Sequence, residues 1–168
     1  MAAGSTYTPI ATTTLTGTAT SYTFSSISSS YTDLILIFNG SLSSGSTDYF
    51  CLQFNGDTAS NYSYTGLYGT GSAAGSLRGT STAYNYTGLY FESGSYQNTN
   101  QIVNIQNYSN TTTYKTTLAR GNNAGLQLGA YAGLWRNTAA INSVKCYTLS
   151  GASFAIGSTF TLYGIQAA

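Results

Sequence analysis

Hydrophobic and polar residues alternate over short runs along most of the chain, and small polar clusters separate the runs. The run TFTLYGI at 159–165 is a clear case, because its odd and even positions fall on opposite sides of an extended backbone. No window of a dozen residues keeps the apolar spacing of an amphipathic helix. The pattern therefore predicts an all-β protein.

The pattern predicts strands at 12–16, 21–24, 33–38, 49–54, 62–68, 84–91, 101–108, 114–120, 126–135, 141–149 and 160–165. The run DLILIFNG is the most hydrophobic, so we expect it to be central and buried on both faces. The stretch GTGSAAGS at 69–76 is typical of a flexible loop. Eleven short strands in one domain favour an antiparallel two-sheet β-sandwich of jelly-roll type, with a barrel as the alternative.

A chain of 168 residues is of a size for one domain, which we place at residues 13–168. Residues 1–12, MAAGSTYTPIAT, are predicted to be an N-terminal arm that is extended around Pro9. Such an arm is suited to adding a strand to a partner's sheet edge, and Tyr7, Pro9 and Ile10 are its candidate contacts. The alternative is a frayed terminus.

One phrase occurs three times: YTGLY at 64–68, YTGLY at 86–90 and YAGLW at 131–135. The spacings of 22 and 45 residues do not continue as a period, so the phrase does not indicate a solenoid or propeller. Neighbouring strands with tyrosine ladders and glycine notches explain it best. A carbohydrate-stacking face and a tyrosine-rich subunit interface are the alternatives, for which the candidate contacts are Tyr62, Tyr64, Tyr84 and Tyr86.

Charge is scarce: 5% of the residues are Asp, Glu, Lys or Arg, where about 25% is ordinary. The formal net charge is +1, and the five basic residues are scattered. A surface of hydroxyl and amide groups steers charged partners weakly, so we expect no nucleic-acid partner. We also expect no membrane partner, because no run has the 18 or so apolar residues of a membrane span.

The sequence lacks the residues of common catalytic sites. It contains no histidine, which removes His-dependent nucleophilic catalysis and His-ligated zinc. The four carboxylates are scattered, without the local pairing that would suggest a glycosidase: Asp33, Asp48, Asp57 and Glu92. The two cysteines lack metal-ligand spacing, and we expect buried thiols, with a disulfide as the alternative. We therefore predict no enzyme, no metal and no cofactor.

Five segments taken in order resemble a group of tailed-bacteriophage virion proteins: YTFSSISSSYTDLILIFNGSL, LQFNGDTASNYS, IVNIQNYSNTTTYKTTLAR, GLWRNTAAINSV and GSTFTLYGIQAA. Members of this group often end in a similar LYGI strand, and the resemblance runs from about Tyr22 to Ile165. It implies a β-sandwich that is displayed on the virion, usually as part of an oligomer. It implies no catalytic residues.

Within this group we expect a capsid decoration or cement protein, because the β pattern starts close to Met1 without the attachment or shaft segment of a tail fibre. Such a protein is made in the host cytoplasm, binds the major capsid protein and itself as a homotrimer, and bridges capsomers. The alternative is a tail-fibre tip or collar module that binds host glycans through tyrosines. A polysaccharide-degrading tail enzyme is disfavoured by the absent histidine and the scattered carboxylates.

Overall fold

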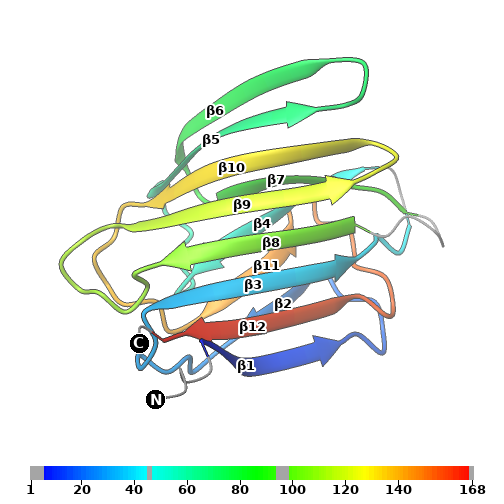
Figure 1. Ribbon diagram of the computed structural model, residues 1–168. Coiled ribbons are helices and arrows are strands. Elements are labelled where there is room, and N and C mark those ends of the chain that lie inside the picture. The colour runs from blue at the N-terminus through cyan, green and yellow to red at the C-terminus, as the bar shows by residue number, and fades with distance from the viewer. Residues whose placement is uncertain (1–5, 45–46, 94–98, 167–168) are drawn as a thin grey trace.

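The computed structural model describes residues 6–44, 47–93 and 99–166. In this part of the chain the regular structure is entirely β, and the twelve strands form two antiparallel sheets that pack face to face (Figure 1). The prediction of an all-β, two-sheet sandwich is confirmed. The strand order does not establish the jelly-roll type, which stays a prediction.

The larger sheet has eight strands and lies in front in Figure 1, from β6 at the top to β1 at the bottom. Its order is β1 (Tyr7–Thr14), β12 (Thr159–Ile165), β3 (Asp33–Gly40), β8 (Thr99–Gln106), β9 (Lys115–Asn123), β10 (Gln127–Trp135), β5 (Tyr62–Gly69) and β6 (Ala74–Thr82).

The smaller sheet lies behind the larger one and has four strands (Figure 1). Its order is β2 (Ser21–Phe24), β11 (Val144–Thr148), β4 (Asp48–Phe54) and β7 (Asn85–Phe91). Strand β7 packs against β5, β9 and β10, and β6 extends beyond it. The larger sheet is therefore covered on one face only.

Strand β3, which contains the most hydrophobic run DLILIFNG, is buried on one face only. Leu34, Leu36 and Phe38 face the smaller sheet and are fully buried, whereas Ile35 and Ile37 alternate with them and remain half-buried. The expectation that this strand is buried on both faces is wrong. Its outward isoleucines contribute to an open face of the larger sheet instead.

Aromatic rings fill the space between the sheets. Phe38 lies at the centre of one cluster, with ring centroids 4.9 Å from Phe50 and 5.0 Å from Phe160. At the other end Trp135 stacks on Tyr62 at 6.2 Å. Such pairs add about 0.5–1.5 kcal/mol each to the stability gained by burying the area, so they hold the two sheets in one arrangement.

The predicted arm at residues 1–12 is not what the structure shows. Residues 7–14 form β1, which pairs along its length with β12, so the domain includes them; residues 1–5 lie outside the described residues. The register shifts at Ile10, between Pro9 and Ala11. Proline and a bulge suit a sheet edge, because proline lacks the N–H of a strand interior. An edge position therefore lets β1 form around Pro9, where the sequence pattern predicted an arm.

Strand β6 was missed by the sequence pattern, which placed a loop at 69–76. Gly75 and Gly79 face the rings of Tyr68 and Tyr64 on β5, where a Cβ would overlap ring atoms. The glycines therefore serve close packing within a strand. The stretch looked flexible because glycine marks both loops and such notches.

Candidate functional site

The three repeated phrases meet in one packing unit. They lie on β5, β7 and β10, and the Tyr131 ring of the third phrase lies between Gly66 of the first and Gly88 of the second. Tyr64 and Tyr86, which open the first two phrases, have ring centroids 4.7 Å apart. The repetition thus reflects packing between neighbouring strands.

The four tyrosines predicted as contacts are mostly inside the molecule. Tyr62 is fully buried, and its hydroxyl accepts a hydrogen bond from the Phe54 N–H at 3.0 Å. Tyr86 is 6% exposed. Tyr64 and Tyr84 are half-buried and stack on each other at 6.4 Å. Burial raises the pKa of all four hydroxyls. A platform made from these four rings is therefore not present.

The predicted contacts of the arm also differ in how exposed they are. Tyr7 is 55% exposed, and its ring meets Tyr163 edge to face at 6.3 Å. Pro9 is exposed at the sheet edge, whereas Ile10 is half-buried against the core. Tyr7 and Pro9 are therefore placed where a partner can reach them.

A broad open surface is the outer face, by which we mean the side of the eight-stranded sheet that faces away from the four-stranded sheet. Exposed leucines lie on it: Leu67, Leu118 and Leu128 are 68%, 45% and 66% exposed. The strand register brings Leu118, Ala132, Thr65 and Arg78 into one row across β9, β10, β5 and β6. The next row holds Arg120, Ala130, Leu67 and Ser76.

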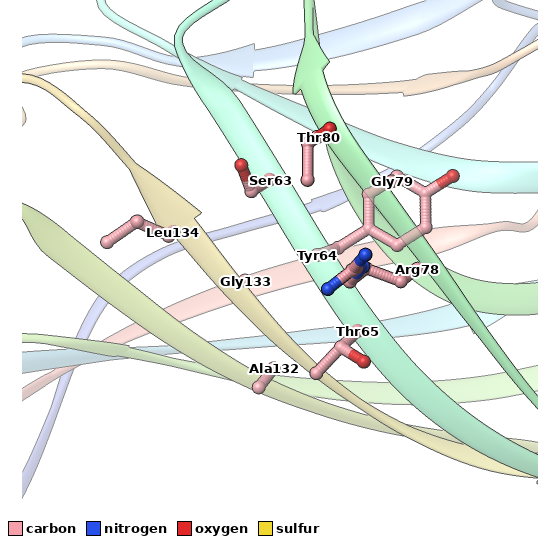
Figure 2. Close-up of a pocket in the computed structure, with 9 residues that line it drawn as sticks. All are labelled: Ser63, Tyr64, Thr65, Arg78, Gly79, Thr80, Ala132, Gly133 and Leu134. Carbon is pink, nitrogen blue, oxygen red and sulfur yellow. The ribbon is translucent and has the colours of Figure 1, made fainter.

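The small side chains on β10 leave a hollow in this face, which is drawn in Figure 2. This hollow, the Arg78 pocket, has a volume of about 250 Å³. Its lining comes from three neighbouring strands: Ala132, Gly133 and Leu134 on β10, Ser63, Tyr64 and Thr65 on β5, and Arg78, Gly79 and Thr80 on β6. Three hydroxyls, one guanidinium and an apolar wall therefore share one site.

The cations near this pocket differ in how they are held. Arg136, at the end of β10, donates hydrogen bonds to the Ser63 hydroxyl and to the backbone oxygens of Ser60 and Tyr62. Arg78 is exposed and has no hydrogen-bond or ion-pair partner among the described residues. Strands β5, β6, β8, β9 and β10 contain no Asp or Glu. This part of the outer face is therefore cationic and partly apolar.

Three carboxylates are engaged in holding the fold. Asp48 is buried and accepts hydrogen bonds from the backbone N–H groups of Tyr49, Ser150 and Ala152. Asp33 accepts from the Asn107 N–H at 2.5 Å. Asp48 begins β4 and Asp57 follows its end, so the two carboxylates belong to opposite ends of this strand. No group of three His, Cys, Asp or Glu is placed to hold a metal within the described ranges.

Asp57 anchors the turn after β4. Its carboxylate accepts hydrogen bonds from the Trp135 indole at 2.7 Å, from the Asn61 side chain at 2.9 Å and from the Ala59 N–H at 2.9 Å. Burial alone would raise the pKa of this carboxyl, but the three hydrogen bonds outweigh it and lower the pKa. The turn itself is made by Asn55 and Gly56, which both have a positive φ.

The other buried ionisable groups are structural. Lys115 is fully buried and donates to the backbone oxygens of Thr113 at 2.8 Å and Thr138 at 3.1 Å, and burial lowers its pKa. Cys51 and Cys146 are buried and free, with pKa values raised by burial. Cys146 pairs with Leu52, so alternation puts the two thiols on opposite sides of the smaller sheet. This excludes the alternative of a disulfide between them in this fold.

A second group of aromatic side chains lies on the smaller sheet. Tyr49 is half-buried, with ring centroids 5.3 Å from Tyr86 and 5.1 Å from Tyr90. Lys145 lies 5.2 Å above the Tyr147 ring. Tyr49 therefore packs mainly on other tyrosine rings, and Tyr147 packs under a lysine.

The outer face was not predicted as a site from the sequence. Its arginine and leucines lie at the polar positions of alternating strands, where apolar residues such as Leu67 and Leu118 are out of pattern. That departure from alternation is the signal in the sequence, and only the strand order turns it into one surface.

Comparisons with known proteins give no family. No family model matches the chain, and no curated protein matches it. Among solved structures, alginate lyase Aly36B is 11% identical, with a TM-score of 0.37 over 92% of this chain and 77% of that chain. A mutant of the same lyase in complex with alginate tetrasaccharide is 12% identical, with a TM-score of 0.33 over 80% of this chain and 68% of that chain. Similarity at this level gives no information about the function of the site.

No helix in the described part of the chain is long and apolar enough to cross a membrane.

Proposed function

We propose that the protein is a bacteriophage virion structural protein that decorates the capsid shell, bridges neighbouring capsomers and does so by protein–protein contact. The outer face is the observation that carries this proposal. It is an open sheet surface on which exposed leucines alternate with Thr, Ser and Asn. The resemblance of the sequence to tailed-phage virion proteins supplies the setting.

The size of the outer face suits a stable protein interface. Eight strands at about 4.8 Å spacing are about 38 Å wide, and eight residues at about 3.3 Å rise are about 26 Å long, which gives about 1,000 Å². A standard interface buries about 800 Å² on each partner. The face is therefore large enough to hold a partner without further elements.

The chemistry of this face also suits a protein partner. Interface cores are enriched in arginine and depleted in Lys, Asp and Glu, as this face is. Uncharged hydroxyl and amide groups can be buried against a partner without the desolvation cost of ion pairs. Many copies on one shell would gain further from multivalent attachment.

A non-catalytic role is part of the proposal. Three of the four carboxylates accept backbone hydrogen bonds, so they are held away from general acid or base chemistry: Asp33, Asp48 and Asp57. The Arg78 pocket is a shallow hollow of about 250 Å³ that opens onto the outer face. These features support binding of a surface rather than of a substrate.

The alternative remains a tail-fibre tip or collar module that binds host glycans. The half-buried rings of Tyr49, Tyr90 and Tyr147 on the smaller sheet, and of Tyr84 just before β7, favour it, because aromatic faces stack on sugars. The packing of these rings on one another weighs against glycan binding.

A self-associating trimer bound to the major capsid protein is the assembly that we propose for the decoration role.

Shell stability tests the proposal. Particles from a phage that lacks this gene are heated with and without the added protein, and DNA release is followed with a fluorescent dye. A cement protein should raise the release temperature in proportion to occupancy and then saturate. Particles that neither bind the added protein nor gain stability would refute the decoration role.

A further inference from the structure

We infer that the Arg78 pocket receives a carboxylate side chain from the shell protein to which this chain attaches. This inference rests on the proposed decoration role, and it adds the contact and the chemistry of the partner. The occupant is a Glu or Asp side chain on a partly apolar protein surface. Arg78 is its counter-ion.

The lining of the pocket offers groups whose chemistry suits such a side chain. The guanidinium of Arg78 presents a planar set of donors that suits a carboxylate in two-point contact. The hydroxyls of Ser63 and Thr80 stand around the same hollow and supply further donors, whereas the Thr65 hydroxyl donates to the backbone oxygen of Leu77 (Figure 2). Ala132 and Leu134 form the side against which a methylene stem can pack.

The floor of the pocket is rigid. Gly79 lies directly over the Tyr64 ring, where a Cβ would overlap it, and Tyr64 in turn packs on Tyr86 at 4.7 Å. Arg136 holds the Ser63 hydroxyl from the end of β10. A site whose walls are fixed before binding loses little conformational freedom when the partner arrives, which favours an anchor contact here.

Charge complementarity singles out a protein other than a second copy of this chain. Asp33, Asp48 and Asp57 already accept backbone hydrogen bonds, and the remaining carboxylate, Glu92, is half-buried. The five strands that carry the pocket and its surroundings have no acid of their own. No strand beside the pocket supplies a carboxylate to Arg78, so we place the matching carboxylate on the partner.

A second cation sets a spacing for the partner. Arg120 lies on the same face, three strands from Arg78 and one row along. Three strand spacings and two residues along a strand separate the two Cα atoms by about 16 Å. The shell surface should therefore carry a second acidic side chain at about that distance from the first.

Binding of variants to shells tests the inference. Shells from the deletion phage are incubated with the purified protein, and the bound fraction is measured by sedimentation. Arg78→Glu reverses the charge, and Ala132→Leu fills the hollow without changing charge. Lys145→Glu, on the other sheet, is the matched control for charge reversal. A melting curve for each variant confirms that the fold is retained.

We expect Arg78→Glu and Ala132→Leu each to weaken binding at least tenfold and Lys145→Glu to leave it within twofold. If the wild-type protein binds and the Arg78 variant binds equally, the inference is wrong while the decoration role stands. If the wild-type protein does not bind, both fall.

A competition assay distinguishes the partner's chemistry. A peptide with Glu flanked by Ala and Leu, and an oligouronate of four sugars, are each added to the bound complex. Displacement by the peptide at lower concentration than by the oligouronate supports a protein side chain in the pocket. Displacement by the oligouronate alone overturns the inference in favour of an acidic glycan.

Discussion

The Tyr131 ring is clamped between Gly66 and Gly88, and this packing gives a prediction about stability. A Gly→Ala change can destabilise the fold in two ways, by steric overlap with the ring and by strain in a backbone with positive φ. A Cβ at Gly66 would overlap the Tyr131 ring, with even the third-nearest atom, Cγ, at 2.6 Å where 3.4 Å or more is ordinary. At Gly88 a Cβ would meet the other side of the same ring, and its φ of +74° strains any L side chain. Gly56 has a φ of +68° but open space, and Gly17 has open space and no such φ.

The four Gly→Ala variants should therefore rank in a defined order. Tyr131 is 2% exposed and has no room to retreat, so Gly66→Ala should cost about 2–3 kcal/mol of unfolding free energy by overpacking. Gly56→Ala should cost about 1–2 kcal/mol from the left-handed backbone alone. Gly88→Ala combines both costs, at about 3–5 kcal/mol. Gly17→Ala should stay within about 1 kcal/mol of wild type.

Equilibrium unfolding in guanidinium chloride, followed by fluorescence, measures these values. Trp135 is the single tryptophan, and it is fully buried between the sheets, so its emission reports on loss of the core. In a Tyr131→Ala background the ring is gone, and Gly66→Ala should then cost less than about 1 kcal/mol. Equal unfolding free energies for Gly66→Ala and Gly17→Ala would refute the clamp.

Other predictions concern ionisation, the Asp57 turn and the thiols. Burial raises the pKa of Tyr131 to about 12, so the stability that its neutral hydroxyl contributes is complete below pH 10 and is lost as the pH rises to about 12. Tyr131→Phe should therefore make the alkaline decline in unfolding free energy shallower, by up to about 3 kcal/mol. Asp57→Ala leaves the buried indole N–H of Trp135 without an acceptor and should lower the free energy of unfolding by about 2–3 kcal/mol. Asp57→Asn keeps an acceptor and should lower it less; denaturant unfolding measures both values. Cys51 and Cys146 should react with a thiol reagent only in denaturant, at two equivalents per chain, and one disulfide in the oxidised native protein would contradict the fold.

Much of the architecture of the larger sheet is predictable because its strands alternate between a buried face and an open face. The alternation in 159–165 places Phe160 and Leu162 in the core as the structure does. The strand Ser21–Phe24 is found at its predicted bounds. Alternation is a local property of the chain, so these elements need no knowledge of the partners in the sheet.

What the sequence did not predict depends on contacts between distant residues. The glycines of β6 look like loop residues until the rings of Tyr64 and Tyr68 are placed over them. Tyr62 and Tyr86 look available for binding until the β5–β6 hairpin and β7 are brought together. The Arg78 pocket likewise needs three strands whose pairing the sequence does not specify.

The copy number of this protein in purified virions tests the central claim most directly. Quantitative mass spectrometry with labelled peptides from this chain and from the major capsid protein gives the ratio of the two. Decoration of the shell predicts hundreds of copies per particle, in a fixed ratio to the capsid subunit. A few to a few dozen copies would contradict the decoration role and would place the protein on the tail.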